Sequence, residues 1–274
     1  MTTDSGSAVV IGDAHLEVLR DVLETGRRQG FLGPGPVEAH IRRSLHFLEA
    51  LPTDARLKGG CPTKHALELY ALDLGSGGGV PGLVLALALP VSRWVLLEAS
   101  RKRSAFLAEA VRRLDLEGRV SVAAERAEEA GLGPLRGSFD LVVARSFAAP
   151  AVTAECGAPF LRSGGLLIVA EPPANLARSD DSPPATAPPS GGPVTTPASG
   201  GPAPTPTSGG LASSAIGSPV GEVRRWPPEP LALLGLAPLA HISVPSALQV
   251  LEQRTLCPSR YPRRTGIPTK RPLF

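Results

Sequence analysis

Residues 71–88 read ALDLGSGGGVPGLVLALA, and this stretch decides the fold. Five glycines fall within residues 75–82, between one apolar run and another. Glycine has no Cβ, so such a stretch can turn tightly and lets a ligand approach the backbone closely. In open α/β proteins the ligand lies beyond the carboxyl ends of the strands, above turns of this kind. The stretch therefore predicts a strand, a ligand-binding turn and a helix.

The sequence around this turn alternates between short apolar strands and helices. Near-continuous apolar strands that alternate with helices predict a mainly parallel sheet covered by helices on both faces. A hairpin of two further strands is expected near the C-terminal end. The strands are expected at residues 70–74, 93–97, 119–123, 139–144, 165–170, 238–244 and 248–255, and the helices of the core at 80–89, 101–114 and 151–161.

The composition changes along the chain and divides it into five predicted parts. Helical spacing of apolar residues at 15–24 and 37–51 precedes the α/β pattern. A later stretch is built from Pro, Ser, Gly, Thr and Ala and lacks the apolar content that would offset the entropy of ordering. The parts are an N-terminal helical region (1–69), an α/β core (70–171), a disordered insertion (172–225), the last helix and strand hairpin of the core sheet (226–255) and a basic C-terminal tail (256–274).

Composition and charge exclude several classes of protein. The 274 residues include three cysteines and no CxxC pair, so neither a disulfide framework nor a zinc site is expected. The N-terminus does not resemble a signal peptide, and no run of about 18 apolar residues occurs. We therefore expect a cytoplasmic protein without a membrane span or a bound metal. No acidic residue follows Glu252, and this basic end suits either a polyanion such as RNA or a solvated tail.

The spacing within the glycine turn discriminates between ligands. A phosphate-binding loop would need a lysine after the glycines, and none follows. A dinucleotide-binding loop would need a third glycine where this chain has Val80, so an NAD-dependent oxidoreductase is a distant alternative. The observed order Asp73-x-Gly75-x-Gly77-x-Gly79 resembles the first motif of class I methyltransferases, which use S-adenosylmethionine (SAM).

Charged residues follow the next strands at positions where they can face the same ligand. Glu98 comes directly after the expected second strand, where a carboxylate can accept hydrogen bonds from both ribose hydroxyls. Residues 125–129 (ERAEE) follow the third strand, close enough to contact an adenine. Arg145 closes the fourth strand and is expected to face the ligand crevice. A surface position is the alternative for Glu98 and Arg145, and an ordinary acidic helix start is the alternative for residues 125–129.

Longer stretches resemble one family, RsmG (glucose-inhibited division protein B), whose members methylate guanine N7 in 16S ribosomal RNA. The resemblance implies a class I SAM-dependent methyltransferase fold, SAM as cofactor, and 16S rRNA or the small ribosomal subunit as partner. It implies SAM contacts at Gly75, Val80, Ala127, Glu128 and Arg145. The matching stretches are residues 73–82 (DLGSGGGVPG), 96–107 (LLEASRKRSAFL), 125–129, 139–149 (FDLVVARSFAA) and 260–273 (RYPRRTGIPTKRPL).

The sequence departs from the family pattern at two places. Members usually carry Asn-Leu-Thr in the N-terminal helical region, where this chain reads GFLGPGP (residues 30–36). Many members end the fifth strand with Lys-Gly, where this chain has Glu171 and a proline. Two alternatives therefore stay open: a diverged paralogue that methylates another RNA or a small molecule, and a non-catalytic RNA-binding protein on the same scaffold.

The expected chemistry needs no catalytic side chain. Guanine N7 has an in-plane lone pair and carries no proton at neutral pH, so it can attack a sulfonium methyl group without a general base. The enzyme would then act through proximity and alignment, and none of the five histidines is expected to be catalytic. We expect a monomer whose tail contacts RNA phosphates, and a weaker, less salt-dependent interaction when Arg263 and Arg264 are replaced by Ala. The expected RNA contacts are Arg260, Arg263, Arg264, Lys270 and Arg271.

Overall fold

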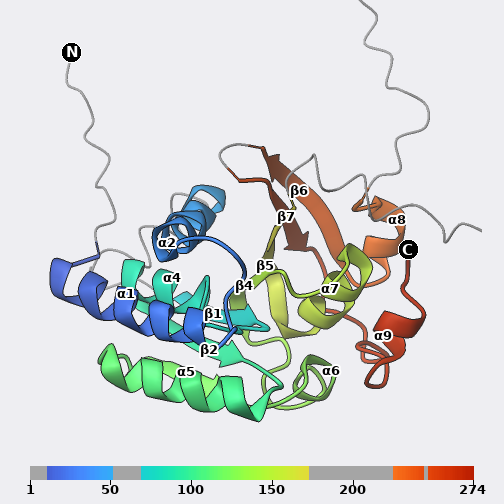
Figure 1. The fold of residues 1–274 in the computed structure, drawn as a ribbon. Helices are drawn as coiled ribbons and strands as arrows, with labels where there is room; N and C mark the ends of the chain where they lie inside the picture. The colour runs from blue at the N-terminus through green and yellow to red at the C-terminus, as the bar shows by residue number, and fades with distance from the viewer. Residues whose placement is uncertain (1–10, 52–68, 173–224, 244–245) are drawn as a thin grey trace, which may run out of the picture. The chain divides into compact units, whose positions relative to one another are not determined.

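The computed structural model describes residues 11–51, 69–172, 225–243 and 246–274 (Figure 1). Nearly all of the predicted insertion, residues 172–225, lies outside the described residues. The predicted helical region 1–69 and the core segment 226–255 are described in part. The other two predicted parts, 70–171 and the tail from residue 256, are described completely.

The described residues form a seven-stranded sheet in the order β3-β2-β1-β4-β5-β7-β6. The first five strands in the chain run parallel, while β7 is antiparallel to both of its neighbours. The reversal of strand order between β1 and β4 creates the topological switch point at which open α/β sheets bind ligands. The strands are β1 (Leu69–Leu74), β2 (Ser92–Leu97), β3 (Val120–Ala123), β4 (Phe139–Arg145), β5 (Leu161–Ala170), β6 (Leu236–Ile242) and β7 (Leu248–Gln253).

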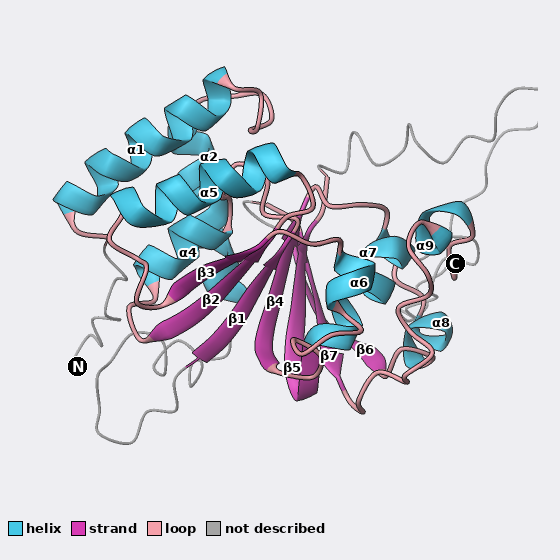
Figure 2. Cartoon of the chain, turned by 90° about the horizontal axis from the view of Figure 1, so that it is seen from below, coloured by secondary structure: helices cyan, strands magenta, loops and turns pink. Residues whose placement is uncertain are grey.

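Helices cover both faces of the sheet, as Figure 2 shows. One apolar cluster joins α1, α2, α4 and α5 to one face, and a second cluster joins α6, α7 and α8 to the other. The predicted doubly wound α/β fold is therefore confirmed. The helices are α1 (Asp13–Arg28), α2 (Val37–Leu45), α4 (Gly82–Ala88), α5 (Arg101–Arg113), α6 (Ala127–Ala130), α7 (Pro150–Gly157), α8 (Pro228–Ala232) and α9 (Ile267–Lys270), with 3-10 turns η1 (His46–Ala50) and η2 (Ala158–Phe160).

The layers form where the sequence pattern places them. The central strands β1 and β4 are buried along nearly their whole length, because helices cover both of their faces. Helix α4, which follows the glycine turn, is also almost wholly buried, between the sheet and the N-terminal helices. Helix α1 by contrast buries one stripe, which includes Leu19, Val22 and Leu23. The N-terminal helices thus pack against the outside of α4 and α5.

The C-terminal tail differs from the expectation of an extended, irregular segment. Residues 267–270 form the short helix α9, which lies beside α7 (Figure 1). The guanidinium group of Arg136 donates to four carbonyl oxygens, three of them in the tail, those of Cys257, Pro258 and Tyr261, at 2.7–2.9 Å. The proline and arginine content of the tail predicted an extended segment whose backbone carbonyl groups have no hydrogen-bond donor within the protein. The backbone carbonyls nevertheless have a donor, supplied by a distant residue that local pattern cannot reveal.

Among the described residues, no helix is both long enough and apolar enough to span a membrane.

Candidate cofactor site at the glycine turn

The glycine turn joins β1 to α4 and needs glycine for its backbone conformation. Gly75 and Gly77 have φ angles of +74° and +54°, in the left-handed region that side chains disfavour. The amides of Gly75 and Ser76 both donate to the carbonyl of Leu97, at 2.9 and 3.0 Å, and so attach the turn to the end of β2. A Cβ on Gly75 would also lie 2.5 Å from the ring of Phe147. The turn is therefore fixed against the ends of two neighbouring strands.

Part of the glycine content serves packing within the chain. A Cβ on Gly78 would lie 2.6 Å from Leu32 Cδ2 and 2.9 Å from the carbonyl oxygen of Phe31. Phe31 is itself held by an edge-to-face contact with Phe106, with ring centroids 5.3 Å apart. The loop between α1 and α2 thus packs on the glycine turn. The glycines were all expected to make room for a ligand, but Gly78 instead makes room for the N-terminal region, whose close approach the sequence pattern does not reveal.

Asp73 contributes a buried carboxylate beside the turn. Its side chain has no solvent exposure, and its Oδ2 accepts a hydrogen bond from the Gly82 amide at 3.0 Å. Its Oδ1 is buried and has no hydrogen-bond partner among the described residues. Burial raises the pKa of Asp73 to about 7, because the ionised form loses its hydration. Buried polar atoms are rarely unpaired, so this oxygen calls for a donor from outside the chain.

Glu98 lies directly beyond β2 and connects the turn to α5. Its Oε2 accepts from the Gly77 amide at 3.0 Å, and its Oε1 accepts from the Ser100 amide at 2.8 Å. Only 6% of the residue is exposed. A carboxylate can accept about four hydrogen bonds, so each oxygen keeps a free lone pair. The predicted ribose-binding carboxylate is thus held rigidly at the edge of the turn.

Arg145 ends β4 and meets a histidine that the sequence argument set aside. Its Nη2 lies 2.8 Å from Nδ1 of His40, and its Nη1 is buried and has no hydrogen-bond partner in the described part of the chain. Burial lowers the pKa of Arg145 to about 10, and the positive charge of the nearby Arg43 contributes to this decrease. His40, on α2, is 2% exposed, and its Nε2 lies 3.1 Å from the carbonyl oxygen of Gly33. A contact between residues 105 positions apart leaves no local signal in the sequence.

These groups share one edge of the sheet. Leu74 pairs with Leu97 of β2 and with Ala144 of β4, so the residues that follow these strands meet at their common carboxyl end. The glycine turn, Glu98 and Arg145 are therefore neighbours, as the sequence predicted. An acid with one free oxygen and a base with one free nitrogen are both buried there. This edge can bind a zwitterionic ligand that carries hydroxyl groups.

The remaining predicted cofactor residues are also close to this edge, but one is already engaged. Val80 and Ala127 are each 7% exposed, at the beginning of the segments that follow β1 and β3. Glu128 is equally buried, and its Oε1 accepts from the Gly266 amide of the tail at 2.9 Å. Arg126 lies 3.8 Å from the same carboxylate. Glu128 thus connects α6 to the tail in addition to any contact with a ligand.

The predicted RNA-binding set divides into two kinds of residue. Four members are exposed: Arg260, Arg264, Lys270 and Arg271. Arg263 by contrast donates from Nε and Nη2 to the two oxygens of Glu155, at 2.8 and 2.6 Å, and its Nη2 also donates to the carbonyl of Arg271. The Glu155 side chain is 1% exposed. A phosphate contact by Arg263 stays a prediction, but its guanidinium group has a structural partner.

Glu171, the acidic departure from the family pattern, also has a structural role. Its Oε1 accepts from Trp226 Nε1 at 2.6 Å, and Arg225 Nε lies 3.2 Å from Oε2. Glu171 directly precedes the predicted insertion (172–225), and Arg225 is its last residue. An acid at this position therefore holds together the two ends of the chain that flank residues 173–224.

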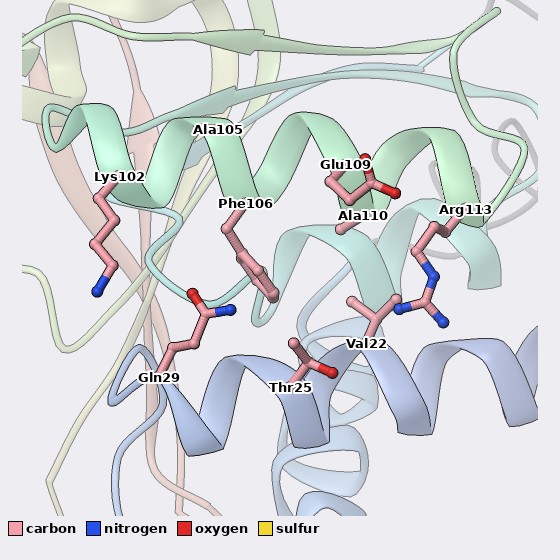
Figure 3. Close-up of a pocket in the computed structure, with 9 residues that line it drawn as sticks. All are labelled: Val22, Thr25, Gln29, Lys102, Ala105, Phe106, Glu109, Ala110 and Arg113. Carbon is pink, nitrogen blue, oxygen red and sulfur yellow. The ribbon is translucent and has the colours of Figure 1, made fainter.

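A separate cavity of about 290 Å³ lies between α1 and α5 (Figure 3). Its apolar lining includes Val22 and Phe106, and Lys102 and Arg113 extend at opposite ends of the groove. None of its lining residues belongs to the predicted cofactor site. Within the described part of the chain, no three His, Cys, Asp or Glu side chains gather in a way that would hold a metal ion.

Comparison of the structure with solved structures supports the fold. The cofactor-bound structure of Rv0187 from MTB matches 91% of this chain and 94% of its own, with a TM-score of 0.52 at 14% identity. At this level of identity the likeness concerns the fold alone.

Comparison of the sequence with known proteins shows the family. Residues 43–174 match the GidB family, described as rRNA small subunit methyltransferase G. A Prochlorococcus marinus (strain NATL2A) protein named Ribosomal RNA small subunit methyltransferase G is 43% identical over 99 residues, which is 36% of this chain and only 40% of the relative. Relatives of the same name from Deinococcus radiodurans and Syntrophomonas wolfei are 33% and 31% identical, over 84% and 88% of this chain and 73% and 87% of their own lengths. The chain belongs to the rRNA small subunit methyltransferase G family.

Proposed function

We propose that this chain transfers a methyl group from SAM to N7 of a guanine in 16S ribosomal RNA, as a monomer in the cytoplasm. The observation that carries the proposal is the pair of unpartnered buried atoms at the glycine turn, Oδ1 of Asp73 and Nη1 of Arg145. The amino-acid part of SAM carries an ammonium and a carboxylate group. A carboxylate oxygen and a guanidinium nitrogen that are both free therefore fit SAM.

The other residues at this edge suit the remaining parts of the cofactor. Glu98 keeps lone pairs for the two ribose hydroxyls, and its backbone hydrogen bonds hold it in place. Gly75 and Val80 would lie along the amino acid and ribose, and Ala127 and Glu128 near the adenine. The names of the relatives from three bacteria, Ribosomal RNA small subunit methyltransferase G, support a methyl donor as the ligand.

The residues of this chain contribute binding and alignment. When bound, SAM supplies an electrophilic methyl group. Guanine N7 needs no proton removed, so the chain requires no general base near it. The titratable groups at the turn, Asp73 and Glu98, hold backbone amides. They would therefore position the donor, and proximity supplies the rate enhancement.

The exposed arginines and lysine of the tail suit the RNA backbone. Arg260, Arg264, Lys270 and Arg271 are free of carboxylate partners in the described structure, and basic side chains of this kind bind phosphates in a salt-dependent way. Glu171 no longer favours a different substrate, because its carboxylate binds Trp226 and Arg225. The alternative of a diverged paralogue therefore loses its main support.

The test is methyl transfer with radiolabelled SAM to small ribosomal subunits, or to naked 16S rRNA, from cells that lack the family's methyltransferase. We expect label at a single guanine, with the N7 position identified by cleavage at the modified base. Binding of SAM without labelling of either RNA would contradict the proposed substrate. Failure to bind SAM would contradict the proposed cofactor.

A further inference from the structure

His40 connects the N-terminal helical region to the cofactor edge of the sheet. It lies on α2, yet its two ring nitrogens contact Arg145 of β4 and the carbonyl of Gly33. Each contact is short, at 2.8 and 3.1 Å, and the residue is 2% exposed. The side chain therefore fills a bridging position between three segments.

The two contacts define the protonation state of the ring. A carbonyl oxygen only accepts hydrogen bonds, so Nε2 must carry the proton that is donated to Gly33. A guanidinium group only donates, so Nδ1 must be the unprotonated nitrogen. A neutral ring with the proton on Nε2 satisfies both contacts. A doubly protonated ring would place an N–H against the guanidinium of Arg145.

The surroundings of the ring favour this neutral form. Burial lowers the pKa of His40, and the positive charge of Arg145 adds to the effect. Arg43, on the same helix, acts in the same direction, while the hydrogen bond to Gly33 opposes it. Asp73 is the acid that acts on Arg145 from β1.

The geometry also accounts for the free nitrogen of Arg145. His40 occupies Nη2, and this contact fixes the plane of the guanidinium group while Nη1 stays unpaired and buried. An arginine side chain has many rotamers, and ordering it on binding costs affinity. A fixed acceptor at Nη2 orders the side chain before the ligand binds, so less conformational entropy is lost on binding.

We propose that His40 is a positioning residue, which holds the Arg145 guanidinium through Nδ1 so that Nη1 faces the carboxylate of the cofactor. The inference rests on the proposed function, because it assigns Arg145 to SAM. It gives the N-terminal helical region a part in cofactor binding, through α2 and the Gly33 loop.

Two substitutions separate the two contacts of the ring. In His40→Asn the amide oxygen replaces Nδ1 and can still accept from Arg145. In His40→Gln the amide nitrogen replaces Nε2 and can still donate to Gly33, while the acceptor for Arg145 is lost. We expect His40→Asn to bind SAM nearly as the unaltered chain does, and His40→Gln to bind about tenfold more weakly, since hydrogen bonds to charged groups are the stronger ones. Isothermal titration with SAM gives both affinities.

The matched controls are His15→Asn and His15→Gln, at an exposed histidine of α1. Neither should alter the affinity, and urea unfolding of all four variants monitors the fold. The opposite order, with His40→Asn weaker than His40→Gln, would show that the Gly33 contact matters and would overturn the inference. Equal affinities for both His40 variants and the unaltered chain would overturn it as well.

The pH dependence gives a second readout. Protonation of His40 removes the acceptor for Arg145. Because burial and Arg145 lower the pKa of His40, the SAM affinity of the unaltered chain should fall only as the pH drops below the usual pKa of a histidine. Asp73 also titrates, but it does so equally in His40→Asn, so the difference between the two pH profiles reports His40. Identical profiles would contradict the inference.

A measurement without cofactor tests the ring directly. In ¹⁵N-histidine-labelled protein at pH 7.5, we expect His40 to show a protonated Nε2 and an unprotonated Nδ1. The reverse tautomer would overturn the inference whether or not SAM binds. Failure of the unaltered chain to bind SAM would instead count against the proposed function and leave this tautomer result standing.

Discussion

Two partly buried arginines have opposite surroundings. Arg263 donates to both oxygens of the buried Glu155, and a backbone carbonyl takes a further hydrogen bond. The Nη2 of Arg145 contacts the neutral ring of His40, and its Nη1 has no hydrogen-bond partner among the described residues. Buried polar groups are normally paired within the chain. The difference indicates that Arg263 holds the tail against α7 through Glu155, whereas Arg145 is available to bind a ligand.

The largest expected effect is the loss of stability on replacing Arg263, the arginine that is paired with a carboxylate. Arg263→Ala leaves the Glu155 carboxylate buried without a counter-charge, so we expect the free energy of unfolding to fall by about 3 to 5 kcal/mol. Arg264→Ala, at the exposed neighbour, should change it by less than about 0.5 kcal/mol. Urea unfolding measures both.

This pair also revises the RNA test. Because Arg263→Ala should weaken the fold, Arg264→Ala with Arg260→Ala is the better probe of phosphate contacts, and we expect a shallower dependence of RNA affinity on salt. An Arg263→Ala protein as stable as Arg264→Ala, but weaker in RNA binding, would return Arg263 to the RNA-binding set.

Replacement of Arg145, whose Nη1 is unpaired, should affect ligand binding more than stability. Arg145→Gln removes a charged partner of the SAM carboxylate, and we expect affinity to fall about 10- to 100-fold, equivalent to roughly 1.5 to 3 kcal/mol. The free energy of unfolding should change less than in Arg263→Ala, since no carboxylate is hydrogen-bonded to Arg145, although Asp73 loses a nearby positive charge. Titration calorimetry and urea unfolding check the two halves. A large loss of stability with unchanged affinity would make Arg145 a structural residue like Arg263.

Glu171 is an acidic residue that, like Arg263, has structural partners within the chain. Glu171→Lys restores the basic residue typical of the family but places it against Arg225, and it removes the acceptor of Trp226. We expect a loss of about 1 to 3 kcal/mol in the free energy of unfolding, from the unpaired indole N–H and the like charges. Thermal and urea unfolding measure it, with Glu229→Lys at α8 as an exposed control. Unchanged stability with tighter RNA binding would show that residue 171 faces the RNA.

Asp73 gives an effect on stability that depends on pH. Its pKa is raised by burial to about 7, so the folded state holds its proton more tightly than the unfolded chain does. Between the ordinary pKa of an aspartate and about pH 7, the free energy of unfolding should therefore decrease as pH rises, by up to about 1.4 kcal/mol per pH unit. Asp73→Asn should remove this slope, as urea unfolding from pH 5 to 8 would show. An equal slope in both proteins would contradict the raised pKa.

The smallest effect concerns the predicted insertion. Glu171 and Arg225 are in contact, so a linker of about 12 residues in place of residues 174–224 can join their flanks. A shorter loop loses less entropy on closure, and we expect stability to rise by about 1 kcal/mol. Methyl transfer and unfolding should otherwise be unchanged. A large loss of either would give this segment a role beyond that of an insertion.

Local patterns predicted the parts of the site that lie within one strand and its following turn. Alternation of apolar runs predicted β1 to β5. The charged residues at the carboxyl ends of these strands followed from the same pattern: Asp73 is the penultimate residue of β1, Glu98 comes directly after β2, and Arg145 ends β4. The pairs that distinguish the two arginines could not be predicted in this way. His40 is 105 positions from Arg145, and Glu155 is 108 positions from Arg263. Such contacts arise only when the helices dock on the sheet.

The most direct test of the account is a crystal structure of this chain with SAM. We expect the methionine part of SAM to lie between Asp73 Oδ1 and Arg145 Nη1, with the ribose hydroxyls on Glu98. SAM bound elsewhere, for example in the cavity between α1 and α5, or SAM at the turn with its carboxylate directed away from Arg145, would contradict it.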